Sequence, residues 1–512
     1  MKRLVTGAQM KEIDRHAIET VGIPSLVLME RAALSVVEEM EPELFREDRI
    51  FVACGTGNNG ADGAAIARML FLRGYNVTVL TAGRQESRTE ELKLQLAIDE
   101  RIGISVMEAE DFIPGSYEVA VDALFGVGLS RNVEGPYRNV IEMICGMAPR
   151  LTVAVDIPSG IHSDTGRVMG RAVRADLTVT FGFEKLGLVL FPGRDYCGRV
   201  AVKDIGFPPC PDVCIGETRF VTFDREDLKK VPARRAYSNK GTYGRVLIAA
   251  GSPGMGGAAY LSALAAYRTG AGLVKILTPR ENCQILQTLL PEAILSAYDR
   301  EEAMEEPESF ALQIERECGW ADAVVLGPGL GREPWAVRLV QQILLSAFVP
   351  IVLDADGLNI VAENPSLSEY FTENVIVTPH VGEMARLTGM EIDEVREHLV
   401  ETAVSYSEKY GVITVLKDAA TVVVKKDEPV YINKSGCSAM AKAGSGDVLT
   451  GVLAGLIAMG MEEGEAAPLG VYLHGLAGEA AAAEYGMHSV LAENLADCLM
   501  RVSEPEKRKR EQ

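Results

Sequence analysis

Basic residues are scarce in this chain of 512 residues, because 51 lysines and arginines face 72 aspartates and glutamates and leave a formal net charge of −21. Such an acidic balance argues against a surface for nucleic acid or for an anionic membrane. The one basic run, at residues 507–510, lies in a polar tail and is interpreted as a solvated end. We therefore expect neither nucleic acid nor a membrane among the partners.

Long apolar runs and an organised set of cysteines are also absent. No apolar run approaches the roughly 18 residues that a membrane span needs, and the residues after Met1 do not resemble a signal peptide. The nine cysteines are odd in number and scattered, and Cys210 and Cys214 have neither a redox nor a zinc spacing. We expect a reduced, cytoplasmic protein with inert thiols.

The length, with a hydrophobic content of 47%, predicts more than one α/β domain. Residues 1–48 have the periodicity of two helices, and short apolar runs then alternate with helical stretches, which is typical of a buried parallel sheet. The alternation breaks near the prolines of 207–211, restarts at 245 and gives way to helices from 448. Two tandem α/β domains are predicted, over 1–215 and 225–502, joined near 211–224. The predicted strands are 50–53, 77–80, 119–121, 153–155, 245–250, 273–277, 323–326, 351–353, 375–377 and 413–416.

The most informative segment is Ala443-Gly444-Ser445-Gly446-Asp447-Val448-Leu449-Thr450-Gly451. Glycines let backbone N–H groups face a ligand, and a helix that begins near Asp447 adds its positive end, so the loop suits an anion such as phosphate. A carboxylate there would repel phosphate, but it can take a proton from a hydroxyl that attacks phosphorus. The pattern indicates phosphoryl transfer.

A second glycine-rich loop, at residues 55–63, directly follows the first predicted strand and begins a helix, which is typical of a dinucleotide site. Asp122 and Asp156 end two further strands, at the edge where open α/β sheets bind ligands. Each aspartate alone could equally be a turn cap. Three such positions at successive strand ends favour a site.

These segments, over about residues 8–213, resemble the YjeF N-terminal domain, the NAD(P)H-hydrate epimerase family, which is a Rossmann-like three-layer sandwich. The resemblance implies a K⁺ ion on Asn59, Asp122 and Ser159 and an acid/base role for Asp156. Lys185 either assists Asp156 or is a solvated surface lysine. The family usually has glycine where Ala61 stands. The residues implied to contact the hydrated cofactor are Asn58, Asn59, Gly60, Ala61, Asp62, Gly126, Val127, Gly128, Leu129, Ser130, Arg131, Asn132, Tyr137 and Asp156.

The second half gathers glycines, acids and a histidine at 240–244, 251–259, 327–331, 354–359 and 378–383, mostly where predicted strands end. Over about 225–502 this set resembles the YjeF C-terminal domain, the ribokinase-like α/β NAD(P)H-hydrate dehydratase. The resemblance implies a hydrate site lined by Ala258, Gly329, His380 and Asp447. It also implies Mg²⁺ with ADP on Lys417, Asp418, Ala419, Ala420, Thr421, Gly444, Ser445 and Gly446. Asp418 replaces a usual glycine, and 436–438 replaces a Gly-Asn-Pro turn.

Together the resemblances imply an enzyme that epimerises R- and S-NAD(P)HX and dehydrates S-NAD(P)HX with ADP, giving AMP and phosphate, while ATP would give ADP. We expect NAD(P)HX and ADP or ATP as small-molecule ligands, and a homo-oligomer. One alternative is a small-alcohol kinase of the ribokinase superfamily with an N-terminal ligand-binding module. The other is a non-enzymatic N-terminal scaffold, against which Asn59, Asp122 and Asp156 count.

Overall fold

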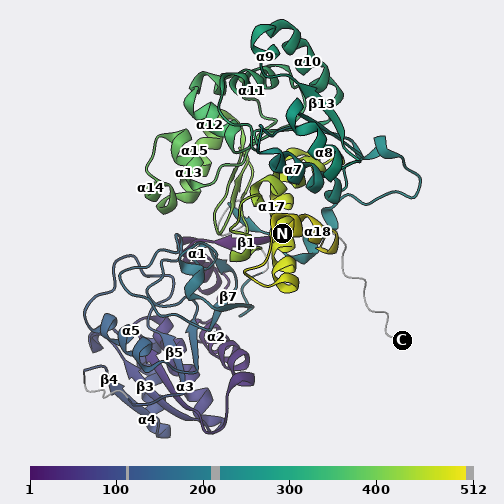
Figure 1. Cartoon of the computed structure of the whole chain (residues 1–512). Helices are drawn as coiled ribbons and strands as arrows, with labels where there is room; N and C mark the ends of the chain where they lie inside the picture. The colour runs from purple at the N-terminus through teal and green to yellow at the C-terminus, as the bar shows by residue number, and fades with distance from the viewer. Residues whose placement is uncertain (111–114, 209–218, 503–512) are drawn as a thin grey trace, which may run out of the picture. The chain divides into compact units, whose positions relative to one another are not determined.

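The computed structural model describes residues 1–110, 115–208 and 219–502, and it divides into two compact units (Figure 1). One unit is Arg3–Phe220, and the other combines Met1–Lys2 with Val221–Gln512. The predicted join near 211–224 falls partly on residues 209–218, which lie outside the described residues, as do Cys210 and Cys214.

The N-terminal unit is built on a parallel sheet of seven strands in the order β4-β3-β2-β5-β6-β7-β9. The chain proceeds from β2 towards one edge and returns to start β5 on the other side of β2. This reversal is a topological switch point, where open α/β sheets bind ligands beyond the carboxyl ends of their strands. The strands are β2 Arg49–Cys54, β3 Asn76–Thr81, β4 Ser105–Glu108, β5 Val119–Ala123, β6 Leu151–Val155, β7 Leu177–Phe181 and β9 Arg199–Lys203.

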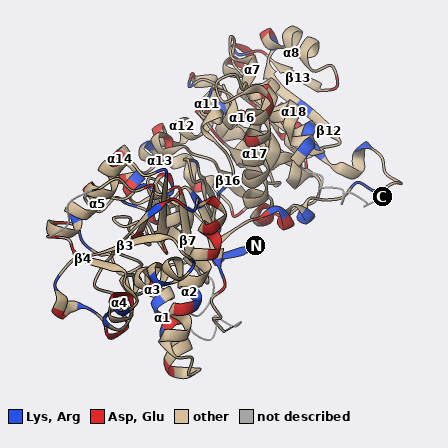
Figure 2. Ribbon diagram, turned by 90° about the horizontal axis from the view of Figure 1, so that it is seen from below, with Lys and Arg blue, Asp and Glu red and all other residues tan. Residues whose placement is uncertain are grey.

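Helices cover both faces of this sheet. Apolar side chains of α2 (Ser25–Met40), α3 (Asn58–Leu72) and α4 (Glu90–Ile102) pack on one face, and those of α5 (Gly135–Met147) pack on the other. The result is the expected three-layer sandwich. Charged residues of both signs lie along α2 and α4, whereas strands β3 and β7 carry none (Figure 2).

The first 48 residues hold more than the two predicted helices. A strand, β1 (Lys2–Val5), precedes α1 (Gly7–Arg15), and a π-helical turn, η1 (His16–Thr20), continues α1. Val5 lies opposite Lys185 of β8 (Glu184–Lys185), so a partner distant in sequence makes β1 a strand. Local periodicity could not reveal such a pairing.

The C-terminal unit is built on strands in the order β13-β12-β11-β14-β15-β16-β17-β18-β19, parallel as far as β17 and antiparallel afterwards. Six of them coincide with predicted strands, while β13, β18 and β19 were not predicted. The bounds are β11 Arg245–Ala249, β12 Leu273–Pro279, β13 Ile294–Tyr298, β14 Ala323–Leu326, β15 Ile351–Leu353, β16 Val375–Val377, β17 Ile413–Leu416, β18 Val422–Val424 and β19 Val430–Ile432.

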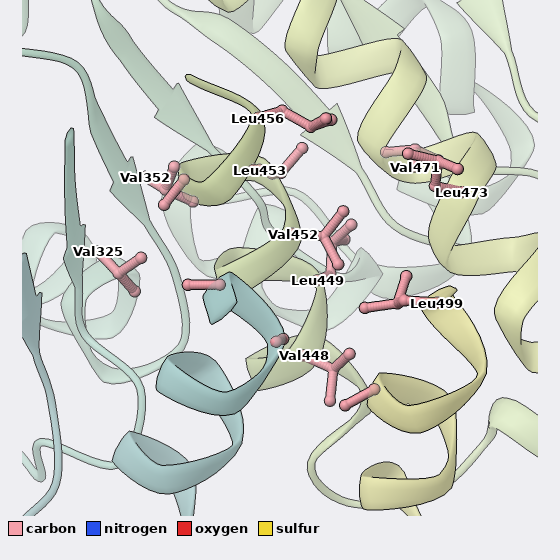
Figure 3. Close-up of a cluster of buried hydrophobic side chains, with 14 of the residues drawn as sticks. Val325, Val352, Val448, Leu449, Val452, Leu453, Leu456, Val471, Leu473 and Leu499 are labelled. Atoms are coloured by element: carbon pink, nitrogen blue, oxygen red, sulfur yellow. The ribbon is translucent and has the colours of Figure 1, made fainter. Parts of the chain in front are cut away.

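One helix, α16 (Ser445–Ala458), runs through the core of this unit. Its apolar side chains meet β14 and β15 and the helices α17 (Glu463–Tyr485) and α18 (Ala492–Val502) (Figure 3). Gly451 lets α7 (Gly256–Thr269) approach closely, since a Cβ there would lie 2.1 Å from the carbonyl oxygen of Ser262. This packing fixes the N-terminus of α16. The other helices include α10 Pro307–Trp320, α11 Pro334–Ser346, α12 Asp356–Glu363, α13 Val381–Thr388 and α15 Leu399–Tyr410.

Among the described residues, no helix combines the length and the apolar character that crossing a membrane requires.

Candidate active sites

The N-terminal unit holds a buried carboxylate and lysine pair at the end of β6. The Lys185 ammonium donates to Asp156 Oδ1 at 2.5 Å, to Thr180 Oγ1 at 2.9 Å and to the carbonyl of Phe181 at 3.0 Å. Lys185 is 1% exposed, so its interpretation as a solvated surface lysine is wrong. One carboxylate oxygen and two further oxygen acceptors thus surround this buried lysine, as a buried charged group requires.

The backbone of Asp156 also has an uncommon conformation, with φ of +67°. A left-handed conformation is disfavoured for a residue with a Cβ and persists where neighbouring contacts hold it. Here Thr180 Oγ1 donates to Asp156 Oδ1 at 3.0 Å, in addition to the bond from Lys185. Strain at a strand end beside a cavity is typical of a functional residue.

Asp156 and Lys185 line a cavity of about 560 Å³, a size suited to a small molecule or cofactor. Its other walls come from α1, the start of α2, the loop after β2 and the loop after β5. The cavity thus lies at the switch point of the sheet. The predicted substrate residues that line it are Asn58, Asn59, Ala61, Asp62, Gly126, Val127, Gly128, Leu129 and Asp156.

Five predicted substrate residues are not among those that line this cavity. Gly60 is buried in the first turn of α3, where a Cβ would lie 1.9 Å from the carbonyl oxygen of Gly55. Tyr137 packs on Phe125, and its hydroxyl lies 3.2 Å from Thr56 Oγ1, so it supports two residues of the cavity wall. Ser130, Arg131 and Asn132 are exposed in the loop after β5. Their substrate contacts stay predictions.

The three predicted K⁺ ligands lie around the same loops. The buried carboxylate of Asp122 accepts the backbone N–H of Ser159 at 2.7 Å, and Ser159 Oγ accepts that of Phe125 at 2.9 Å. Burial raises the pKa of Asp122 to about 6, against the effect of its bonds to Ser159. The amide nitrogen of Asn59 is buried and has no hydrogen-bond partner in the part of the chain that the structure describes. A buried carboxylate surrounded by neutral oxygen donors fits a hard alkali cation.

The C-terminal unit has its candidate site at the N-terminus of α16. Gly444, with φ of +91°, begins the helix in a conformation that favours glycine, and the N–H groups of the first turn have no acceptor within the helix. A Cβ on Gly446 would lie 3.3 Å from both Asp354 Oδ2 and Lys417 Nζ. The glycine loop therefore meets an acid and a cation from two strand ends.

Lys417, which is 20% exposed, and the buried Asp354 form a second ion pair, with 2.7 Å between Nζ and Oδ1. Burial opposes the charge on Lys417, but Asp354 and Glu383 outweigh it and raise the pKa of this lysine. Asp447 stands apart from the pair. Burial and then repulsion from Asp354 raise the pKa of Asp447 to about 7, although Lys417 acts in the other direction. A carboxylate that titrates near neutral pH is suited to proton transfer.

The other predicted hydrate-site residues come from three further strand ends. Ala258 and Gly329 lie together, because a Cβ on Gly329 would be 2.9 Å from the Cβ of Ala258. His380 begins α13, and its Nδ1 accepts the N–H groups of Gly382 and Glu383. Burial and then Lys417 lower the pKa of His380, so the ring is neutral with its proton on Nε2. His380 can therefore donate a hydrogen bond to a ligand.

The predicted nucleotide segment follows β17. Lys417 forms a backbone bridge with His380, and Thr421 Oγ1 donates to the carbonyl of Asp418 at 3.2 Å. Asp418 and Ala419 are exposed, whereas Ala420 and Thr421 are buried. The side chain of Asp418 thus lies at the surface. Ser445 Oγ donates to the carbonyl of Met440. The backbone of Ser445 belongs to the first turn of α16.

Sequence reasoning missed several residues that the structure brings to these sites. In the N-terminal unit they are Asp14, which lines the cavity, and Thr180, which holds Asp156. In the C-terminal unit Asp354, which the sequence showed only as a strand-end acid, pairs with Lys417. Met10, Asp14 and Ile18 are spaced four residues apart, so the sequence could have predicted that they share one face of a helix. It could not have predicted that this face lines the cavity.

Comparison with known proteins covers both units. A family model described as NAD(P)H-hydrate dehydratase matches residues 246–501, and one described as YjeF-related protein N-terminus matches residues 25–187. The bifunctional NAD(P)H-hydrate repair enzyme Nnr of Moorella thermoacetica is 40% identical over 97% of this chain and 96% of its own length. Its counterpart in Thermofilum pendens is 37% identical over 96% and 94%. A crystal structure of the ADP/ATP-dependent NAD(P)H-hydrate dehydratase of Bacillus subtilis is 32% identical, with a TM-score of 0.46, over 55% of this chain and 96% of its own.

Proposed function

This chain belongs to the family of bifunctional NAD(P)H-hydrate repair enzymes, and we propose that it epimerises and dehydrates hydrated NADH and NADPH at two separate sites. The epimerase is assigned to the cavity around Asp156 and the dehydratase to the N-terminus of α16. The observation that carries the proposal is Asp447, a carboxylate with a pKa raised to about 7 in the first turn of a helix, where N–H groups have no acceptor within the helix.

The dehydratase would make the C6 hydroxyl of the hydrate a better leaving group. Asp447 takes the hydroxyl proton while the oxygen attacks the terminal phosphorus of ADP, and AMP departs. Phosphate then leaves C6 and a proton leaves C5, which restores the double bond of NAD(P)H. The N–H groups of Gly446 and Asp447 and the Lys417 ammonium face the charge that develops on the phosphoryl oxygens.

Magnesium would enter with the nucleotide. Mg²⁺ is commonly held by substrate phosphates and one or two carboxylates, and Asp354 and Asp356 both act on Asp447 electrostatically, so carboxylates are at hand. When bound, the ion would offset charge on the phosphates. ADP, rather than ATP, is the donor that we propose, following the family resemblance.

The epimerase would invert C6 so that both epimers of the hydrate reach the dehydratase. Asp156, which accepts hydrogen bonds from Lys185 and Thr180, is the proton acceptor that we assign. The K⁺ ion that we place on Asn59, Asp122 and Ser159 would stabilise the charge of the buried Asp122 carboxylate and order the loops after β2 and β5.

The two other functions considered from the sequence receive less support. A small-alcohol kinase would keep its phosphorylated product, but the family model that matches residues 246–501 is a dehydratase model. A scaffold would not require the buried pair of Asp156 and Lys185. We place the enzyme in the cytoplasm, where its described cysteines, which are all free, would remain reduced.

The test of this function uses the purified full chain and hydrated NADH as a mixture of both epimers. With ADP and Mg²⁺, the absorbance of NADH should return until the whole mixture is consumed, and AMP and phosphate should appear in equal amounts. Recovery without nucleotide consumption, or a phosphorylated product that accumulates, would contradict the proposal.

A further inference from the structure

The helix at the start of the N-terminal unit brings an acid to the epimerase cavity. Met10, Lys11, Asp14 and Ile18, on α1 and the π-helical turn η1 that continues it, all line the cavity. Residues four apart lie on the same face of a helix, so Met10, Asp14 and Ile18 form one stripe. This stripe faces the same space as Asp156 and Lys185.

The position of α1 is fixed by contacts at its first turn. Thr6 caps the helix through Gln9, and the N–H of Gly7 donates to Asp164 Oδ1 at 2.6 Å. Met10 and Ile13 are buried with Val5 in a cluster that includes Val127 of the loop after β5. Asp14 is therefore carried by a rigid element and not by a mobile loop.

The Asp14 carboxylate has no hydrogen bond or ion pair with any of the described residues, although charged groups surround it. Asp14 is exposed at the cavity, yet its pKa is raised to about 6, first by desolvation and then by Asp156, while Lys185 acts in the other direction. The charged groups that line the cavity with Asp14 are Lys11 on its own helix, Asp62 on α3, Glu91 on α4, and Asp156 and Lys185 at the sheet edge, and Arg15 follows Asp14 in the chain. At neutral pH Asp14 thus holds a proton part of the time and can give it away.

Inversion of a carbon that bears both a hydroxyl and a ring nitrogen needs two proton transfers. The C6–O bond breaks as the hydroxyl takes a proton and leaves as water, and the electron pair of N1 forms a planar C6=N1 iminium. A water then adds to the opposite face and gives up a proton. One acid and one base are required. The Lys185 ammonium donates its three protons to Asp156, Thr180 and Phe181, so the pair offers the Asp156 carboxylate as a base and leaves the role of the acid to another group.

We propose, on the basis of the epimerase function proposed above, that Asp14 is the second catalytic residue of this site. Asp14 donates the proton to the departing hydroxyl, and Asp156 accepts the proton of the incoming water. In the reverse direction Asp156 donates and Asp14 accepts. The pair shares one proton, and each inversion moves that proton from one carboxylate to the other, so no outside reagent except water is needed.

The test compares Asp14→Asn with wild type in the full chain, following the interconversion of the two hydrate epimers by chromatography without nucleotide. Removal of a proton donor typically costs about 10²–10⁴-fold in rate, so we expect a loss of at least about 100-fold. The matched control is Glu19→Gln, an exposed carboxylate on η1 that does not line the cavity, which should keep the wild-type rate. Dehydration of the correct epimer with ADP reports in every variant that the chain is folded.

The pH profile separates a proton-transfer role from a structural one. The wild-type rate should fall as the pH rises through about 6, because Asp14 loses its proton, and Asp14→Asn should lack this limb. Asp14→Glu should retain it with a rate above that of the Asn variant. More than half of the wild-type rate in Asp14→Asn, or loss of the limb in Asp62→Asn instead, would overturn the assignment to Asp14. If wild type itself does not interconvert the epimers, the proposed epimerase function fails.

Discussion

The two candidate sites use the same pair of charges in different ways. Asp156 and Lys185 in one unit, and Asp354 and Lys417 in the other, each join a lysine to a carboxylate at the end of a parallel strand, at 2.5 and 2.7 Å. In the N-terminal site we assign the chemistry to the paired carboxylate itself. In the C-terminal site the chemistry falls to a third group, Asp447, whose pKa is raised to about 7.

This difference follows from what each reaction needs. Phosphoryl transfer gathers negative charge, so a lysine beside the glycine loop is useful for the phosphates and the base must be a separate group. Epimerisation at the neutral C6 centre builds up no negative charge on the substrate, so Lys185 needs to interact with no charged group other than the Asp156 carboxylate. The four predictions below test this division, from the largest expected effect to the smallest.

Asp447→Asn should lower the rate of dehydration by about 10²–10⁴-fold, since it removes the proton acceptor. Binding of ADP should stay the same or become tighter, because a charge near the phosphates is lost. Initial rates with the correct epimer and titration calorimetry with ADP measure the two effects. The assignment of Asp447 as the base is wrong if the variant keeps more than a tenth of the wild-type rate.

Asp156→Asn should lower epimerisation by about 10²-fold or more and leave dehydration of the correct epimer unchanged. Asp195→Asn, which changes an exposed aspartate of the same unit that does not line the cavity, is the matched control. If Asp156 were only a turn cap, its loss would cost about 1 kcal/mol of stability with an unchanged epimerisation rate. Rate and thermal unfolding, measured on the same samples, distinguish the two roles.

The rate of dehydration should fall as the pH drops through about 7, because burial and Asp354 raise the pKa of Asp447 and the base must be ionised to work. Epimerisation should not share this limb. Profiles of both activities on one preparation of wild type give the comparison. If the residual dehydration activity of Asp447→Asn still falls as the pH drops through about 7, the titrating group is not Asp447.

Potassium should raise the rate of epimerisation several-fold and leave dehydration unaffected, because Asn59, Asp122 and Ser159 belong to the N-terminal unit alone. The measurement replaces KCl by tetramethylammonium chloride at constant ionic strength. Asp122→Asn should reduce the response to potassium. Equal epimerisation rates in the two salts would remove the case for this cation site.

The sequence predicted those parts of the molecule that depend on neighbours in the chain. The strands Arg49–Cys54, Asn76–Thr81, Val119–Ala123 and Leu151–Val155 and the loop before Asp447 were found because apolar runs and glycines mark them locally, whereas Ser105–Glu108 was not predicted. The strand Lys2–Val5 was missed because its pairing with Glu184–Lys185 is set across a long stretch of sequence. Burial of a charged residue is equally non-local. Lys185 could have been a surface residue in the sequence, and only the fold places it against Asp156.

Asp14 and Asp354 show a further limit. Both are single acids in ordinary helical or strand-end contexts, and their surroundings come from elements far away in the chain. A pKa is set by such surroundings, so no sequence pattern could have ranked Asp447 above Asp354 as the base on electrostatic grounds.

The central claim is that one chain carries two sites, each with a single reaction. Its most direct test is the recovery of NADH from a mixture of both hydrate epimers with excess ADP, using Asp156→Asn, Asp447→Asn and an equal mixture of the two variants. The account predicts that recovery of NADH by Asp156→Asn stops when the correct epimer is consumed, apart from slow spontaneous epimerisation. Asp447→Asn should recover almost no NADH, and the mixture of the two variants should convert both epimers completely. Complete recovery by Asp156→Asn alone at the wild-type rate would contradict it.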